Sequence, residues 1–125
     1  MDMLSGDEIA AAGLTDWCKL AQGLHARFLT DDFAAGVRFV GAIGAAVAVL
    51  DHHPQVSMGQ YHVDLRLVSD DAVYREDDGT EHVVQWVTQQ DVDLARRISD
   101  IAADQRLPAD QDSVSVLELG LATAN

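Results

Sequence analysis

A chain of 125 residues can form one domain around a single hydrophobic core but is too short for two. Its 21 acidic residues far outnumber its eight basic ones, and the net charge of −13 argues against direct binding to nucleic acid or an anionic membrane. A neutral small molecule remains a compatible ligand. The single cysteine, Cys18, excludes an intramolecular disulfide, and the lack of a signal-like start makes a cytoplasmic location the default expectation.

The first part of the chain predicts a short helix, two strands and a long helix. Ser5-Gly6-Asp7-Glu8 matches a capping box, so a helix is expected over about Asp7 to Ala12. Trp17 to Leu29 predicts two short strands with Gly23 in the turn between them. Thr30-Asp31-Asp32 then starts the longest helix. Its expected buried stripe is Phe33, Val37, Val40, Ile43, Val47 and Leu50.

The second part predicts a strand, a hairpin and another helix. Val63 to Val68 alternates as a strand does, and Asp78-Gly79 lies between two β-rich runs, which indicates a hairpin over Val73 to Trp86. Thr88-Gln89-Gln90-Asp91 resembles a capping box and starts the next helix, which ends near Asp104. Its expected buried stripe is Leu94, Ile98, Ile101 and Ala102.

The motif with the clearest chemical potential is Asp51-His52-His53-Pro54, directly after the long helix. Proline cannot continue a helix and disfavours helical geometry in the residue before it, so both imidazoles lie where helix gives way to extended chain. Imidazole titrates near neutral pH and suits general acid–base chemistry. Taken alone, the pair fits a structural role better than a catalytic one, with one histidine capping the helix and the other exposed.

The order of these elements and motifs resembles the pterin-4a-carbinolamine dehydratase family, also called 4a-hydroxytetrahydrobiopterin dehydratases. The resemblance covers roughly residues 5 to 105 and lies in an ordered set of segments. These are Leu24 to Phe28, Asp32-Phe33, Phe39-Val40, Asp51 to Pro54, Val63 to Leu67 and Thr88 to Ala95.

The resemblance implies an α+β fold: a four-stranded antiparallel sheet with about three helices packed on one face, here with an extended hairpin insertion. It implies a homodimer or homotetramer, no metal and no cofactor. The implied reaction dehydrates a 4a-hydroxytetrahydropterin to the quinonoid dihydropterin. In that reaction the departing hydroxyl gains a proton and a ring nitrogen loses one.

By position, the resemblance implies that His52 and His53 are catalytic, one as proton donor and base and the other orienting the pterin. Pro54, Tyr61 and Ser69 are implied to bind the substrate. Asp70 stands where the family carries a third histidine, and a carboxylate is a poorer acid near neutral pH unless its pKa is raised.

Three further departures from the family pattern concern the surroundings of this motif. Ala48 stands where the family has an acidic residue, the expected tyrosine falls one position late at Tyr61, and Asp71 to Trp86 replaces a short link. His82, in that insertion, is a candidate for the missing histidine or, more simply, an exposed hairpin residue. The alternative function is therefore a pterin-binding or oligomerisation and regulatory module on the same scaffold.

The tail suggests a boundary near residue 106. Residues 1–106 form the expected domain, and residues 107–125 are expected to hold a linker and an extra strand. The run from Val114 to Leu121 resembles the opening strand of a glyoxalase-like domain, which makes it a candidate for the start of a second domain.

Overall fold

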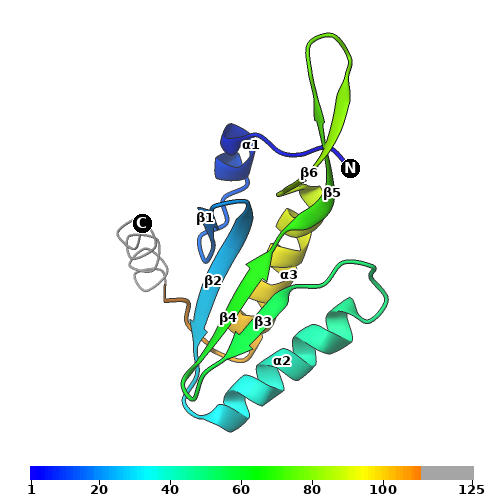
Figure 1. Cartoon of the computed structure of the whole chain (residues 1–125). Coiled ribbons are helices and arrows are strands. Elements are labelled where there is room, and N and C mark those ends of the chain that lie inside the picture. Colours follow the sequence, from blue (N-terminus) through cyan, green and yellow to red (C-terminus); the bar gives the residue numbers. More distant parts are fainter. Residues whose placement is uncertain (111–125) are drawn as a thin grey trace, which may run out of the picture.

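The computed structural model describes residues 1–110, which fold as the expected α+β domain. Four antiparallel strands form one sheet in the order β1-β2-β4-β3, while β5 and β6 form a separate two-stranded sheet that projects from the body (Figure 1). In chain order the elements are α1 (Gly6–Ala11), β1 (Cys18–Leu20), β2 (Gly23–Leu29), α2 (Phe33–Val47), β3 (Gln55–Met58), β4 (His62–Leu67), β5 (Ser69–Arg75), β6 (Glu81–Trp86) and α3 (Gln89–Asp104).

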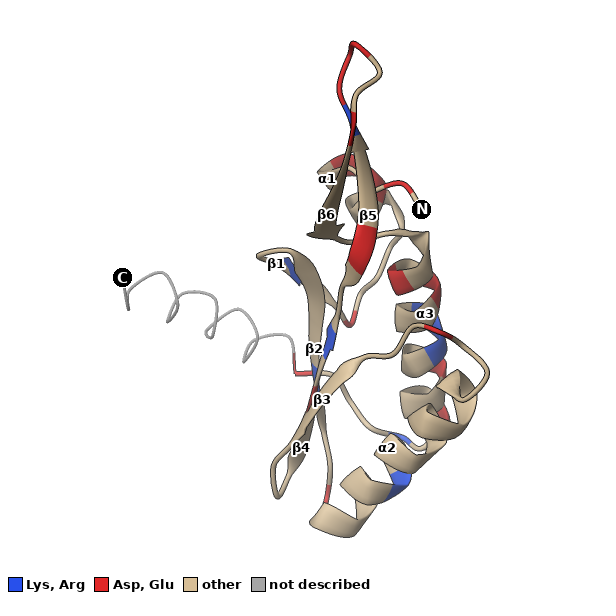
Figure 2. Ribbon diagram, turned by 45° about the vertical axis from the view of Figure 1, so that its right-hand side comes forward, with Lys and Arg blue, Asp and Glu red and all other residues tan. Residues whose placement is uncertain are grey.

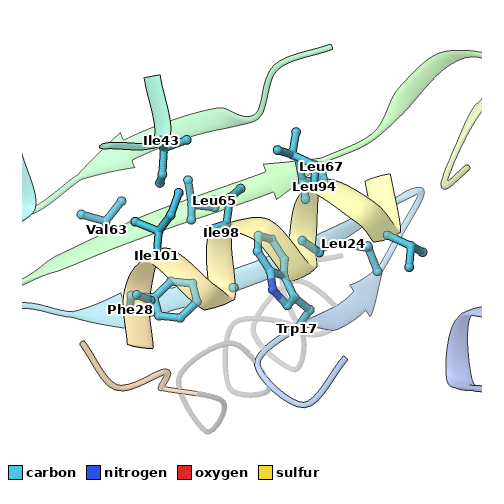
Figure 3. Packing of buried hydrophobic residues seen from close by; sticks show 14 of the residues in the cluster. Trp17, Leu24, Phe28, Ile43, Val63, Leu65, Leu67, Leu94, Ile98 and Ile101 are labelled. Carbon is cyan, nitrogen blue, oxygen red and sulfur yellow. The ribbon is translucent and has the colours of Figure 1, made fainter. Parts of the chain in front are cut away.

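The core lies between one face of the four-stranded sheet and the helices. Because side chains alternate along a strand, β2 and β4 bury every second residue, and α2 and α3 lie together on that side of the sheet (Figure 2). Phe28 meets Trp17 and Phe39 edge to face, with ring centroids 6.3 and 5.3 Å apart. Figure 3 shows this packing, to which β2 contributes Leu24 and Phe28, β4 contributes Val63, Leu65 and Leu67, and α3 contributes Leu94, Ile98 and Ile101.

The helix starts follow the predicted capping residues. In α1 the Glu8 amide donates to Ser5 Oγ at 3.1 Å, and the Ser5 amide donates to Glu8 Oε1 at 3.0 Å. In α2 the Ala35 amide donates to Asp32 Oδ1 at 2.7 Å. The buried stripe predicted for α3 is also confirmed.

The stripe predicted for α2 is wrong at both ends. The helix ends at Val47, and Phe33 and Val37 are 53% and 50% exposed. The apolar residues of α2 occupy two faces of the helix, one buried and one exposed. Spacing in the sequence does not distinguish these faces and predicts a single stripe. The face that contacts the sheet and α3 consists of Ala35, Gly36, Phe39, Ile43 and Val47.

Two glycines allow close approach of neighbouring elements. A Cβ on Gly36 would lie 3.0 Å from the end of Met58 and 3.4 Å from Val63, so its absence lets α2 approach the sheet. Gly23 lies inside β2, where a Cβ would be 2.9 Å from the carbonyl oxygen of Leu67. The prediction that Gly23 forms the β1–β2 turn is therefore wrong, and Ala21 supplies the positive φ, 53°, in that turn.

The hairpin prediction is confirmed, whereas β3 was not anticipated because Gln55–Met58 shows no clear alternation. Asp78 Oδ1 accepts from the Thr80 amide at 2.9 Å, and Gly79 takes a φ of 90°, as expected for a tight turn.

No helix within residues 1–110 has the length and apolar character needed to cross a membrane.

The start of the expected linker continues the structure of the domain. The Leu29 amide donates to the Pro108 carbonyl at 2.8 Å, and the Asp110 amide donates to the Arg27 carbonyl at 2.7 Å, so this segment pairs with the end of β2. The strand expected over Val114 to Leu121 lies outside the described residues.

Candidate functional site

His52 lies in the connection between α2 and β3 and contacts a buried carboxylate from α3. Its Nε2 atom hydrogen-bonds Asp91 Oδ1. The His52 side chain is 19% exposed and the Asp91 side chain is fully buried. Since a carboxylate accepts, the proton of a neutral His52 lies on Nε2, which leaves Nδ1 as the ring atom that can exchange a proton with a ligand.

The other carboxylate oxygen of Asp91 is bound from two directions. Asp91 Oδ2 accepts from Ser69 Oγ at 2.8 Å and from the Thr88 amide at 2.9 Å. Ser69 Oγ also lies 2.9 Å from Thr88 Oγ1. Strand β5, the start of α3 and the loop after α2 therefore meet at one buried carboxylate, and this network sets the orientation of the imidazole.

A pocket of about 360 Å³ opens beside His52, between the loop after α2 and the outer surface of α3. Its walls combine apolar and polar side chains, a composition typical of small-molecule sites. The α3 residues that line it follow helical spacing, because positions three, four and seven apart share one face. The lining residues are Val49, Leu50, Asp51, His52, Gln90, Asp93, Leu94 and Arg97.

The other expected catalytic residues lie apart from this pocket lining. His53 is exposed, and its Nε2–H donates to the Leu50 carbonyl at 2.9 Å. Asp70 is exposed and accepts from Gln85 Nε2 at 2.8 Å. Its neighbour Ser69 points the other way into the Asp91 network, since successive strand residues face opposite sides.

The expected substrate-binding residues do not lie together, because Pro54 and Ser69 are at one end of the β3–β4 pair and Tyr61 is at the other. Pro54 is half-buried immediately before β3, and Tyr61 is 56% exposed just before β4. Ser69 reaches the pocket only through Asp91 and His52. His82 sits on the hairpin, stacked on Tyr74 with ring centroids 6.2 Å apart and 3.4 Å from Glu76.

Asp91 is the residue that sequence reasoning missed as a site component. The motif Thr88-Gln89-Gln90-Asp91 predicts a helix start and belongs to the segments that resemble the family, and the Thr88 amide does donate to the Asp91 side chain. The same carboxylate also accepts a hydrogen bond from His52, 39 positions earlier, and no local pattern reveals that contact.

Within residues 1–110 no cluster of three or more histidine, cysteine, aspartate or glutamate side chains is arranged to hold a metal ion.

Residues 2–101 match the family model described as pterin 4 alpha carbinolamine dehydratase. The chain belongs to this dehydratase family. The match spans every helix and strand from α1 to β6 and most of α3, and it includes His52, Ser69 and Asp91.

Individual relatives agree with this membership of the pterin-4a-carbinolamine dehydratase family. A protein of Natronomonas pharaonis named "Putative pterin-4-alpha-carbinolamine dehydratase" is 30% identical over 101 residues, which cover 81% of this chain and 97% of that one. One of the same name from Thermosynechococcus vestitus is 30% identical over 95 residues, covering 76% and 87%. Among solved structures, a transcriptional coactivator/pterin dehydratase from Brucella melitensis superposes with a TM-score of 0.65 at 25% identity, covering 81% and 99%.

Proposed function

We propose that this chain dehydrates a 4a-hydroxytetrahydropterin to the quinonoid dihydropterin, with His52 as the acid–base residue. The observation that carries the proposal is the contact between His52 and the buried carboxylate of Asp91, at the edge of a pocket lined by both apolar and polar side chains. The family supports dehydratase chemistry in general.

The reaction breaks the C–O bond at the hydroxylated ring carbon and forms a C=N bond to the neighbouring ring nitrogen. The nitrogen loses a proton, the oxygen gains one, and water leaves. His52 can take the first proton on Nδ1, and Asp91 stabilises the resulting imidazolium because its carboxylate already accepts from Nε2. The same imidazolium then gives the proton to the departing oxygen, so the residue returns to its starting state.

The two histidines are therefore assigned different parts in this proposal. His52 carries the proton transfer because it has the buried carboxylate partner, whereas His53 donates to a backbone carbonyl and is exposed. The part proposed for His53 and Pro54 is limited to orienting the pterin from beside the pocket. Tyr61 is assigned no part, because it lies beside Thr30 at the opposite end of α2 from His52. Asp70, held by Gln85 at the surface, is not assigned a proton-transfer step.

The alternative function is a pterin-binding module with weak or no turnover. It is favoured by the presence of one imidazole among the described residues that line the pocket, and by the outward placement of Asp70, at the position where the family carries a third histidine. The two functions differ in turnover but share ligand binding.

The test is to measure dehydration of a 4a-hydroxytetrahydropterin with and without the purified chain. A rate well above the spontaneous one supports the dehydratase. A spontaneous rate, together with saturable binding of a dihydropterin, supports the binding module. Absence of both turnover and binding would reject both functions.

We further propose that the protein forms homo-oligomers through the outer face of α2. Phe33 and Val37 expose about half of their side-chain surface there, and Gly41 and Gly44 have no neighbouring atoms within 4 Å of a Cβ position. Phe33, Val37, Gly41 and Ala45 are four residues apart, so they form one ridge that can pack against the same ridge of a second copy. Arg38 is the one charged residue of α2, so the outer face of this helix is otherwise apolar.

Val37→Arg is expected to raise the dissociation constant of the oligomer about tenfold or more, because a buried unpaired charge costs well over 1.4 kcal/mol. Sedimentation velocity over a concentration series measures it. Val83→Arg is the matched control, since Val83 is 72% exposed on the hairpin. A wild-type chain that stays monomeric, or equal effects of the two variants, would contradict this interface.

A further inference from the structure

The face of the four-stranded sheet opposite the helices carries polar side chains in aligned rows. Strand pairing places Cys18, His25, Arg66 and Gln55 opposite one another across all four strands. Residues directly opposite on neighbouring strands lie about 5 Å apart, so their side chains can act on one ligand. Within residues 1–110 the helices pack on the other face, which leaves this row accessible.

A groove of about 240 Å³ lies along this row. Its lining side chains are those that bind anions by hydrogen bonding, namely the Arg66 guanidinium, the His25 imidazole, the Gln55 amide and the Ser57 hydroxyl. Its volume is below the range typical of drug-sized ligands, which favours a small group over a nucleotide. The groove is separate from the His52 pocket, with no lining residue in common.

The groove lining carries one guanidinium, Arg66, and one carboxylate, Asp64, in a chain that is strongly negative as a whole. Asp64, the acidic residue of the lining, is already bound by Arg27, with N–O distances of 2.6 and 2.9 Å, and lies 3.7 Å from His62. Arg66 has a neutral partner instead, since its Nη1 atom donates to Gln55 Oε1 at 3.3 Å, and it takes part in no salt bridge among the described residues. Arg66 is therefore the uncompensated charge of the groove.

The pKa of His25 responds to the positive charge of Arg66. This pKa lies below the ordinary value, first because the ring is partly buried and second because Arg66 repels the protonated form. The Leu20 backbone and the Asp64 carboxylate act in the opposite direction, and Lys19 adds a further lowering. An anion bound to Arg66 would offset the repulsion and raise the pKa of His25.

We infer that the groove formed by His25, Arg66, Gln55 and Ser57 on the open face of the sheet is a binding site for a small oxyanion. A guanidinium binds the planar or tetrahedral oxygens of a carboxylate or phosphate through paired N–H groups. The amide and the hydroxyl supply further donors from the adjacent strand β3. This site lies outside the chemistry proposed for His52 and does not depend on it.

The test follows the imidazole of His25 by NMR in the full chain labelled in histidine. Methyl phosphate and acetate are titrated separately, with sodium chloride at the same ionic strength as the blank. We expect a saturable shift of the His25 resonance and a rise in its pKa, with His53 and His82 unchanged. The anion that saturates at lower concentration identifies the ligand as phosphate-like or carboxylate-like.

Arg66→Gln is expected to weaken this binding about tenfold or more, because the charge-assisted hydrogen bonds are lost. Arg75→Gln is the matched control, since Arg75 lies on the hairpin and pairs with Asp2 and Glu81. Ser57→Ala keeps every charge and is expected to weaken binding several-fold, which tests the groove even if Arg66→Gln unfolds. Shifts equal to those in chloride, or unchanged by both groove variants, would overturn the site.

Discussion

Replacing His52 by alanine is expected to lower kcat for 4a-hydroxytetrahydropterin dehydration by about 10²–10⁴-fold, the range of a lost general acid–base residue. The imidazole lies at the pocket edge and has a buried carboxylate partner, and no second imidazole lines that pocket within the described residues. Stopped-flow assays against the spontaneous dehydration measure the loss. Binding of a dihydropterin is expected to change less than kcat, because the residue acts mainly in the transition state.

His53→Ala provides the matched comparison, since it removes the neighbouring imidazole from the same loop. Its ring is exposed and donates to the Leu50 carbonyl, so a loss of less than about tenfold in kcat is expected. A larger effect of His53→Ala than of His52→Ala would reverse the assignment. Turnover that persists when both histidines are replaced together would remove the catalytic role from this motif altogether.

Asp91→Asn is expected to impair both folding stability and turnover. The asparagine amide has a single acceptor oxygen, so it cannot accept from His52 and from both Ser69 and Thr88 as the carboxylate does. Loss of hydrogen bonds to a buried charged group costs about 1.5–3 kcal/mol in the free energy of unfolding. Since His52 also loses the group that sets its tautomer, kcat is expected to fall by about 10–100-fold or more in the folded protein.

Urea denaturation and assays on the folded variant separate these two effects. Asp100→Asn on the same helix is the control, because Asp100 is exposed and such surface changes stay within about 0.5 kcal/mol. Full activity in folded Asp91→Asn would show that the carboxylate only stabilises the fold. Unchanged stability would contradict the buried network itself.

Much of the fold could be predicted because local patterns and tertiary structure agree along most of the chain. The alternation from Leu24 to Phe28 becomes β2, and the stripe of α3 packs where its spacing predicts. Prediction failed where a segment has no strong local preference, as in β3, and where one helix presents apolar residues on two faces. Only packing against the sheet decides which face of α2 is buried, and periodicity alone cannot show it.

The candidate site was harder to predict because it depends on contacts between distant segments. The motif around His52 could be found, but its partner Asp91 could be recognised only as a capping residue. The pair Ser69 and Asp70 shows the same limit, because a shift of one residue in strand register exchanges which side chain points inward. In the fold the serine reaches Asp91 and the aspartate meets Gln85 at the surface.

The way the β5–β6 hairpin joins the domain has a consequence for evolution. Ser69 at its beginning pairs with Trp86 at its end, and Ser69 Oγ lies 2.9 Å from Thr88 Oγ1. Further along β5, the N-terminal segment holds the arm at Val73, whose carbonyl accepts from the Met3 amide at 3.0 Å. Beyond the contacts with the N-terminal segment, the outer part of the arm projects away from the helices and the sheet (Figure 1). Mutations and length changes in its outer part can accumulate with little cost to the Asp91 network. The hairpin is therefore a region where new surface properties can be acquired while the Asp91 network is retained.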